Sequence, residues 1–364
     1  MIIVGGGIVG ASFAYHANLI GLDEITLLSS SLPGDKEQAT SNTWGWINGY
    51  AFNDKNYAAF RLANLNYWPK LIKDLNKQTT TSSGAFFWDL EGVELNKIIA
   101  QHQDWGHAVK NVNKKELERY LPNLVNKPVM AGLGEKDLTI EGAIVSSELI
   151  KASCSKIKKV NVSKIICEGN KVIGVETEHD IIYTDEVIIA AGLGTPDLLS
   201  SININFKMHS SLGLLAYTNP LPKLLNYPIT GVDFHVRQDN KGRLVIGGKF
   251  DDDASKEINV NKAAEKLVQD MSSRLNYNGT VTLDHYTLGS RPLPIDGRPK
   301  IGRLKNHNGN KIEGIYVAVM HSGITNAPLA GKLGIEEVTT GKRNTLIADF
   351  LPQLDTDNES VSNV

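Results

Sequence analysis

The sequence predicts an α/β protein in which a Rossmann-type domain, built from both chain ends, is interleaved with an α+β domain that has a mostly antiparallel sheet. Three observations predict this architecture. The chain opens with an apolar strand, a glycine-rich turn and a helix pattern. Closely spaced strand patterns fill its middle, and a strand, a polar loop and a helix pattern return near its C-terminus. Because neither end holds enough strands for a complete parallel sheet, both ends are expected to share one.

The glycine-rich turn has the spacing that a bound pyrophosphate requires. Gly5 permits a tight turn after the strand, Gly7 lets the backbone approach the phosphates, and Gly10 lets the next helix pack on the strand. Ile8 and Val9 lie between these glycines, just before the predicted helix, whose N-terminus offers free N–H groups to an anion. We therefore expect all five of these residues to contact a dinucleotide cofactor.

The apolar character of the N-terminal segment has an alternative explanation. Residues 1–22 contain no Asp, Glu, Lys or Arg, which is also typical of a signal peptide or a membrane span. However, no basic segment precedes the apolar residues, and five glycines with His16 and Asn18 interrupt them. We interpret the segment as a βα unit that is apolar because it is buried on both faces.

Hydrophobic periodicity predicts the remaining elements. Helices are expected at 11–19, 56–77, 114–120, 261–275 and 328–339. Strands are expected at 24–28, 84–88, 160–162, 165–167, 172–175, 181–183, 187–191 and 314–319, with a further β-rich section at 209–248. We assign 1–83, 141–208 and 286–352 to the Rossmann-type domain, 84–140 and 209–285 to the second domain, and 353–364 to a flexible tail.

Composition excludes several classes of partner. The chain has 364 residues, a net charge of −2 and no block of basic residues, which argues against nucleic acid as a partner. Its two cysteines, Cys154 and Cys167, are isolated, which indicates a reducing compartment and argues against a metal cluster. We expect no transmembrane segment and a cytoplasmic location, with peripheral membrane association left open.

The end of the second strand departs from the usual dinucleotide pattern. A carboxylate is expected there to hold the ribose hydroxyls, but the sequence has Ser29 and Ser30. A serine hydroxyl still forms a hydrogen bond, although a weaker one than a carboxylate forms. Asp35 and Glu37 are the nearby alternatives. This departure affects the ribose site and leaves the prediction of the fold unchanged.

Five further segments occur in the order found in the D-amino-acid oxidase superfamily, which includes glycine oxidase, sarcosine oxidase and D-amino-acid dehydrogenase. The segments are Ala39–Trp46, Glu141–Val145, Thr184–Gly192, Leu288–Gly302 and His321–Thr325. Together they span almost the whole chain, which therefore resembles this superfamily. The resemblance implies that the Rossmann-type domain binds FAD.

The resemblance also implies which residues contact the cofactor. Besides the glycine-rich turn and the serines at 29 and 30, they are Thr40, Ser41, Thr43, Trp44, Val162, Ala191, Gly192, Gly289, His321, Ser322, Gly323, Ile324 and Thr325. Trp44 and Trp46 fit the border of the flavin and an ordinary protein core equally well. The helix that follows Thr325 would direct its N-terminus at the reduced flavin.

Arg291 matches the family arginine that grips a substrate carboxylate. A guanidinium keeps its charge and forms two parallel bonds to a carboxylate, although an ion pair with Asp296 is the alternative. We expect Trp46 and Asn48 to contact the substrate as well. His321 is a candidate acid or base, although a histidine at this place more often packs beside the cofactor.

The implied reaction is oxidation of a small amino acid or N-alkyl amino acid. A hydride passes from the amine-bearing carbon to flavin N5, an imine forms, and oxygen or a quinone or carrier protein takes the electrons. The sarcosine-oxidase branch attaches its flavin to a cysteine, but this chain has Gly289 and Ser290 at that place, so the flavin is expected to be non-covalent. The resemblance implies that Val245 matches that branch's oxygen-activating lysine, which would make the reaction with oxygen slow.

Three other functions are weighed against this one. A flavin-dependent 2-hydroxy-acid oxidase or dehydrogenase would need a base, for which His321 is the candidate. An FAD-carrying subunit of a larger dehydrogenase complex is disfavoured by the presence of Arg291. A nicotinamide dehydrogenase would leave the segments around Gly192 and His321 unexplained. An oligomer or a hetero-complex is compatible with the sequence.

Overall fold

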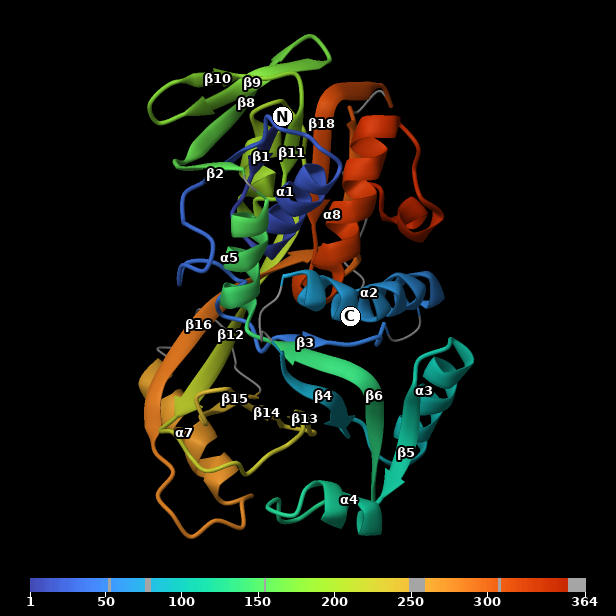
Figure 1. The fold of residues 1–364 in the computed structure, drawn as a ribbon, viewed down its shortest axis with the longest axis vertical. Coiled ribbons are helices and arrows are strands. Elements are labelled where there is room, and N and C mark those ends of the chain that lie inside the picture. Colours follow the sequence, from blue (N-terminus) through green and yellow to red (C-terminus); the bar gives the residue numbers. More distant parts are fainter. Residues whose placement is uncertain (52–53, 76–79, 154, 249–258, 307–308, 353–364) are drawn as a thin grey trace. The chain divides into compact units, whose positions relative to one another are not determined.

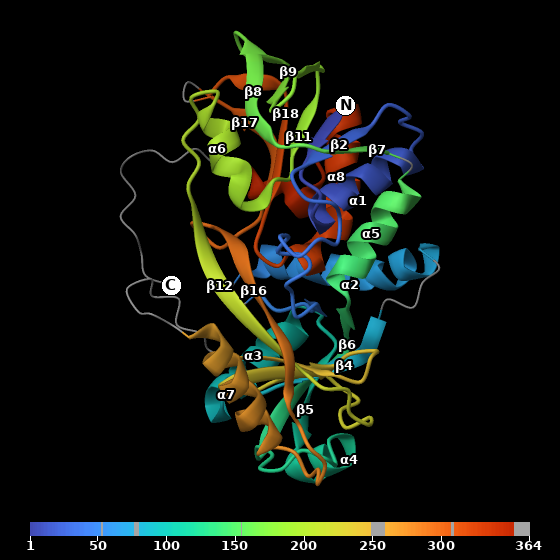
Figure 2. The same ribbon diagram turned by 90° about the vertical axis from the view of Figure 1, so that its left-hand side faces the viewer.

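The chain divides into two compact units. The computed structural model describes residues 1–51, 54–75, 80–153, 155–248, 259–306 and 309–352, and Figures 1 and 2 show its elements in two views. Unit 1 comprises 1–41, 142–211 and 291–364, and unit 2 comprises 42–141 and 212–290. The tail predicted at 353–364 lies outside the described residues.

Unit 1 is built on a parallel sheet to which both chain ends contribute. Its central strands are β1 (Ile2–Val4), β2 (Thr26–Ser29), β11 (Val187–Ile189) and β18 (Lys311–Val319). Along the sheet the strand order is β10-β9-β18-β11-β1-β2-β7. Ile3 is paired with Leu27 on one side and with Ile188 on the other, both in parallel. The predicted Rossmann-type fold is confirmed.

Helices cover both faces of this sheet. α1 (Ile8–Leu19) packs between α5 (Gly142–Ala152) and α8 (Gly323–Thr340), while α6 (Thr195–Ser200) lies on the opposite face (Figure 2). α1 and α8 approach each other so closely that a Cβ at Gly331 would lie 2.4 Å from the hydroxyl oxygen of Ser12. The crossing of these helices therefore depends on a glycine.

Several boundaries in unit 1 differ from the prediction. α8 begins at Gly323 rather than at 328, with Pro328 inside the helix, and α5 was not expected at all. The strand expected at 160–162 is replaced by β7 (Lys156–Lys159), whose four side chains are all exposed. The sequence of β7 has no apolar alternation from which a strand could be predicted. The strand is defined by its parallel pairing with β2. The rest of unit 1 comprises β8 (Val162–Glu168), β9 (Lys171–Thr177), β10 (Ile181–Tyr183), η1 (Gly192–Gly194), β17 (Lys300–Lys305) and η2 (Thr345–Phe350).

Unit 2 contains a mostly antiparallel sheet with the strand order β16-β12-β15-β14-β13-β4-β6-β3, in which β5 also pairs with β6. These strands are β3 (Trp46–Ile47), β4 (Thr80–Phe87), β5 (Val109–Asn113), β6 (Met130–Ile140), β12 (Met208–Thr218), β13 (Ile229–Thr230), β14 (Phe234–Gln238), β15 (Leu244–Gly248) and β16 (Leu283–Pro294). The amphipathic helix α7 (Val260–Ser272) covers one face of it, with Val268 and Met271 in the same apolar core as Ile246. The helices α2 (Lys55–Asp74), α3 (Gly92–Asp104) and α4 (Lys114–Tyr120) complete the unit.

The structure groups residues 42–83 with unit 2, whereas the prediction assigned them to the cofactor domain. β3 and β4 both pair with β6, so the segment shares its hydrogen-bond ladders with the antiparallel sheet. The helical periodicity of α2 shows that one of its faces is buried, but it does not identify the sheet against which that face packs. This boundary is therefore corrected.

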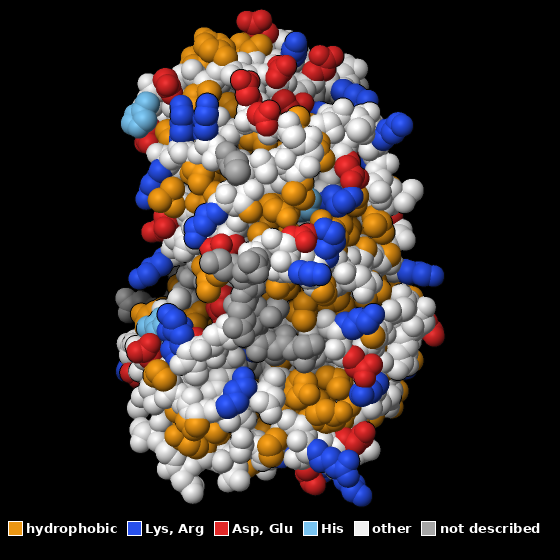
Figure 3. Space-filling model, in the orientation of Figure 1, with side chains coloured by type: hydrophobic (Ala, Val, Ile, Leu, Met, Phe, Trp, Pro, Cys, Tyr) orange, Lys and Arg blue, Asp and Glu red, His pale blue; other side chains and the backbone are white. Residues whose placement is uncertain are grey.

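The described parts of the chain hold no helix that is both long and apolar enough to cross a membrane. On the face of the molecule in Figure 3, Lys and Arg side chains are interspersed with Asp and Glu.

Candidate active site

The glycine-rich turn of unit 1 forms an open cradle at the N-terminus of α1. Gly5 has a φ of +117°, and a Cβ there would lie 2.2 Å from the carbonyl oxygen of Ala190. A Cβ at Gly10 would lie 2.0 Å from the carbonyl oxygen of Gly5. A Cβ at Gly7 meets only the Thr40 hydroxyl, at 3.2 Å. Gly5 and Gly10 are thus required by the fold, whereas Gly7 borders open space at the N-terminus of α1.

Two hydroxyl groups hold this turn in place. The Gly6 N–H donates to Ser29 Oγ at 3.0 Å, and the Ile8 N–H donates to Thr40 Oγ1 at 3.0 Å. Ser29 therefore supports the turn, while Ser30 is exposed just beyond β2. The carboxylate of Asp35 accepts from the Leu32 N–H at 2.8 Å, so it closes its own loop.

Gln38 is a cradle residue that the sequence analysis missed. It is buried, its Oε1 accepts from the Gly34 N–H at 3.3 Å, and a Cβ at Gly6 would lie 3.1 Å from its Nε2. No motif marks a glutamine at this place. Only the folded loop shows that its amide lies beside the glycine-rich turn.

A second helix N-terminus lies next to the cradle. A Cβ at Gly323 would lie 3.4 Å from Val9 Cγ2, so the first turns of α1 and α8 are neighbours. Ser322, the N-cap of α8, has a left-handed conformation with φ of +55°, and His321 Nδ1 lies 3.1 Å from its hydroxyl oxygen. Ile324 and Thr325 are buried within the first turn. The dipole thus begins at Gly323 rather than after Thr325, which corrects the prediction.

The carboxyl ends of the parallel strands place the other predicted cofactor residues. Ala191 and Gly192 follow β11, and Gly192 has a φ of +56° with no neighbour within 4 Å of its Cβ position. Such an edge is where open α/β sheets bind ligands. Val162 begins β8 with its side chain in the core of unit 1, so only its backbone is available to a cofactor.

The cradle fits the pyrophosphate of FAD. Two adjacent helix N-termini supply N–H donors and positive dipole ends to an anion. In addition, Ser41 Oγ is buried and has no hydrogen-bond partner among the described residues, as expected of a group that contacts a ligand. The residues that would hold the cofactor are Gly5 to Gly10, Thr40, Ser41, Gly192 and Ser322 to Thr325.

In unit 2, Trp44 and Trp46 form an edge-to-face pair with ring centroids 5.8 Å apart. Gly45 between them has a φ of +80°, and its carbonyl accepts from the Ile140 N–H at 3.0 Å. Thr43 closes this turn, because its hydroxyl accepts from the Gly45 N–H at 3.2 Å. Both tryptophans are half-buried.

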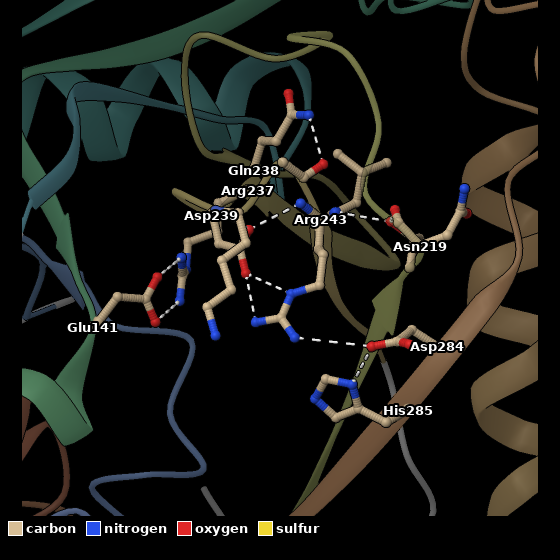
Figure 4. A network of polar contacts seen from close by, with 12 residues as sticks. Glu141, Asn219, Arg237, Gln238, Asp239, Arg243, Asp284 and His285 are labelled. Carbon is tan, nitrogen blue, oxygen red and sulfur yellow. Dashed lines mark hydrogen bonds and ion pairs between the residues drawn. The ribbon is translucent and has the colours of Figure 1, made fainter.

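Arg237 is a second residue that the sequence analysis missed. Its side chain is only 2% exposed, and it forms two parallel bonds with Glu141, at 2.6 and 3.2 Å (Figure 4). Its Nε donates to the carbonyl of Trp44 at 2.7 Å. The alternation in β14 is the signal that could have revealed it, because Phe234 and Val236 face the core and Arg237 faces the other side.

A neighbouring network stiffens the same sheet. Arg243 pairs with Asp239 at 2.8 Å and lies 3.9 Å from Asp284, as Figure 4 shows. Its guanidinium lies over the ring of Tyr217 at 5.2 Å, and Tyr217 stacks on His285 with centroids 4.4 Å apart.

A buried polar cluster lies beneath Trp46. Asp137 is fully buried, and its carboxylate oxygens contact His107 Nε2 at 3.0 Å and accept from Trp46 Nε1 at 3.1 Å. Burial raises the pKa of Asp137, although its contacts with His107 and Trp46 and the charge of Arg61 act in the opposite direction. Burial, reinforced by His107 and Arg61, lowers the pKa of His102 to about 4.

Asn48 and Arg291, the other predicted substrate residues, have different surroundings. Asn48 is buried in unit 2, and its amide oxygen accepts from Arg61 at 2.6 Å and from the Tyr50 N–H at 3.1 Å. Arg291 is exposed on β16 and donates from Nη2 to Ser211 Oγ at 2.9 Å. Asp296, the alternative partner of Arg291, pairs with Lys300 at 2.7 Å.

Gly289, the position that replaces an attachment cysteine, is buried against Asn42. A Cβ there would lie 2.5 Å from Asn42 Cβ. A larger side chain at 289 would therefore require the 42–46 loop to shift.

The fold and the glycine-rich turn define a protein of the dinucleotide-binding class. The chain belongs to the family of FAD dependent oxidoreductases designated DAO, which it matches over residues 1–336. It is 22% identical over 374 residues to an uncharacterized oxidoreductase of Bacillus subtilis, covering 95% of this chain and 96% of that protein. It is 24% identical over 356 residues to glycine oxidase of Bacillus licheniformis, covering 91% and 90%. The structure of iminodiacetate oxidase from a Chelativorans species superposes with a TM-score of 0.81 at 18% identity, covering 96% and 98%. The protein is therefore an FAD-dependent oxidoreductase.

Replacing Gly7 with valine should abolish FAD retention without unfolding the apoprotein, because the new side chain enters the space for the pyrophosphate and meets little protein. Gly10→Val is the matched comparison, since it forces the backbone at Gly5 to move and should lower the melting temperature of the apoprotein. Flavin content after gel filtration and thermal unfolding of the apoprotein separate the two effects. If Gly7→Val retained as much FAD as the parent, the pyrophosphate could not bind at this turn.

Acidification should destabilise the protein through His102. The folded state keeps this side chain neutral down to about pH 4, whereas the unfolded chain protonates it below its ordinary pKa of 6.5. Stability therefore falls as pH falls between 6.5 and about 4, by up to about 1.4 kcal/mol per pH unit from this residue. His102→Phe should flatten urea-unfolding free energies across this window. Identical slopes in the parent and His102→Phe would contradict the assignment.

Proposed function

We propose that this protein oxidises a small amino acid or N-alkyl amino acid at the carbon that bears the amine, and releases an imine. The observation that carries the proposal is Arg291, an exposed guanidinium on β16 in a chain with an FAD cradle. A planar, permanently charged guanidinium forms two parallel bonds to a carboxylate. In the structure its Nη2 donates to the hydroxyl oxygen of Ser211 at 2.9 Å.

The relatives support an amine next to a carboxylate as the substrate class. The Bacillus licheniformis relative is a glycine oxidase, and the similar Chelativorans structure is an iminodiacetate oxidase. Glycine and iminodiacetate share a carbon that lies between a nitrogen and a carboxylate. Arg291 in this chain would hold that shared carboxylate.

The protein's part in the reaction is binding and orientation. FAD, when bound, accepts the hydride that leaves the amine-bearing carbon. Arg291 would fix the substrate carboxylate, and a fixed geometry of this kind contributes up to about 7–11 kcal/mol to catalysis. A substrate amine that binds in its neutral form needs no dedicated base. The N-terminus of α8 at Gly323 would stabilise negative charge that develops on the cofactor.

The surroundings of Val245 bear on the electron acceptor. Val245 is fully buried and clusters with Leu215 and Tyr217, against which Trp44 packs. An apolar side chain supplies no positive charge to stabilise reduced oxygen species. We propose that the reaction with oxygen is slow and that a quinone or a carrier protein takes the electrons.

Acid or heat should release the flavin intact, because Gly289 and Ser290 occupy the place of an attachment cysteine. The purified protein should be yellow, and its precipitate colourless after trichloroacetic acid treatment. Flavin that stays with the precipitated polypeptide would contradict the non-covalent assignment. A colourless protein that takes up no FAD would contradict the proposed function itself.

Arg291→Lys should weaken substrate binding roughly ten- to a hundredfold, because loss of one charge-assisted bond costs about 1.5–3 kcal/mol. Flavin content should remain normal. Anaerobic bleaching of the flavin by D- and L-amino acids, N-methyl amino acids and 2-hydroxy acids measures this without knowledge of the electron acceptor. Arg274→Lys, in which the new side chain can still pair with Asp233, is the matched control.

An amine without a carboxylate should be a poor substrate for the parent and should be indifferent to Arg291→Lys. Equal losses for substrates with and without the carboxylate would show that Arg291 supports the fold or the cofactor instead. If only 2-hydroxy acids bleached the flavin, the group oxidised would be an alcohol and not an amine.

A further inference from the structure

We propose that α3 is an acid-released helix: protonation of the buried imidazole of His102 detaches α3 from the sheet of unit 2, while the strands of that unit stay paired. All the residues involved belong to unit 2. The device is therefore independent of the substrate, and it lets one helix respond to acid before the unit unfolds.

α3 (Gly92–Asp104) is held on unit 2 by one narrow face. Its buried residues are Leu95, Ile99 and His102, whose spacing places them on one side of a helix. Leu95 and Ile99 belong to the apolar core of the unit, and the helix lies beside β5 (Figure 1). His102 is thus the polar member of the docking face, and it lies at the C-terminal end of that face.

The surroundings of His102 suit a neutral ring and not an imidazolium ion. The side chain is fully buried, and the rings of Tyr50, Trp105 and His107 lie around it with centroids 4.8, 5.2 and 5.7 Å away. Neither of its ring nitrogens has a hydrogen-bond partner among the described residues. A neutral imidazole has one N–H to satisfy, whereas its protonated form has two and carries a charge. Protonation in place is therefore costly.

The cations of the cluster add to this cost. Burial lowers the pKa of His102 to about 4, and the charges of His107 and of Arg61 from α2 act in the same direction. Arg61 is itself buried and donates to the amide oxygen of Asn48 at 2.6 Å. Protonation of His102 in its docked position would leave two cations buried in one cluster.

The buried acid of the cluster serves a different histidine. The carboxylate of Asp137 on β6 contacts His107 Nε2 at 3.0 Å and accepts from Trp46 Nε1 at 3.1 Å. His107 therefore has a counterion, whereas His102 has none among the described residues. The charge on a protonated His102 is relieved only when the ring reaches water.

The other titratable groups of the packed elements are neutral or face solvent. Burial raises the pKa of Tyr50, and Asp137 and Asp89 raise it further, so this phenol stays neutral in acid. Lys110 on β5 pairs with Glu135 on β6 at 2.7 Å, and both side chains are nearly half exposed. The remaining charged residues of α3 and β6 are exposed, and they are Glu94, Lys97, Asp104 and Lys136.

Glycines in left-handed conformations bracket the helix. Gly92 begins α3 with a φ of +57°, and Gly106 follows it with a φ of +87°; neither has a neighbour within 4 Å of its Cβ position. Hinge movements are absorbed at a few positions of this kind at the ends of an element. β4 and β5, the strands on either side of α3, are each anchored by pairing with β6. α3 can therefore leave its site without breaking a ladder.

The pH range of release follows from the proton affinities of the two positions of the helix. Docked His102 binds a proton only near pH 4, whereas a released His102 binds it near its ordinary pKa of 6.5. The released helix therefore takes up a proton as pH falls below 6.5. Between 6.5 and about 4, each pH unit favours release by up to about tenfold.

Hydrogen exchange of the FAD-loaded protein, corrected for the intrinsic effect of pH on amide exchange, tests the proposal. Between pH 6.5 and 5, protection of the amides of α3 should fall by about tenfold, while protection in β5 and β6 should change by less than about threefold. In His102→Phe the protection of α3 should not depend on pH. His102→Leu serves the same purpose if the phenylalanine variant fails to fold.

Ile99→Val is the matched control, because it weakens the same docking face without changing a titratable group. It should lower the protection of α3 by the same factor at both pH values. Parental protection of α3 that is unchanged between pH 6.5 and 5 would overturn the proposal. Equal losses in α3, β5 and β6 would do so too, since unit 2 would then unfold as a whole. A pH-dependent loss that persists in His102→Phe would show that another group titrates.

Discussion

The parallel pairing of β11 between β1 and β18 is the constraint on which unit 1 depends. It joins three short segments from distant parts of the chain, since Ile188 pairs with Ile3 on one side and with Tyr316 on the other. β1, β11 and residues 315–319 of β18 are all buried, which supplies the free energy for closing two long connections. Once they are paired, their carboxyl ends share one edge of the sheet.

The cradle follows directly from that pairing. β1 leads into α1 and β18 leads into α8, so the two helices begin side by side at the same edge. Glycine is required where backbones touch, as at Gly10 over Gly5 and at Gly331 against Ser12. The close packing that these glycines allow also brings two positive helix ends together. Both helix ends can then stabilise an anionic group of the cofactor.

Unit 2 has a different physical character, because two buried charges are built into its sheet. Arg237 is compensated by a bidentate pair with Glu141, whereas Asp137 has only a histidine and an indole as neighbours within hydrogen-bond reach among the described residues. Buried pairs of this kind seldom add stability over apolar residues, although removal of one partner is strongly destabilising. They make the positions of the Trp44 carbonyl and of the Trp46 ring specific, and both belong to the segment that follows the cradle.

The sequence by itself determined the Rossmann-type fold, the glycine-rich turn and the family, because these depend on local rules: a strand, glycines at a set spacing and a helix start. It also identified the presence of α2, α4 and α7 from their apolar periodicity. Only the tertiary structure decided that residues 42–83 join unit 2 and that the amide oxygen of Asn48 accepts from Arg61. It also placed Gln38 beside the glycine-rich turn, Arg237 against Glu141 and Asp137 against Trp46. Each of these depends on a partner far away in the sequence, and a polar residue in a strand does not reveal whether it faces water or a buried charge.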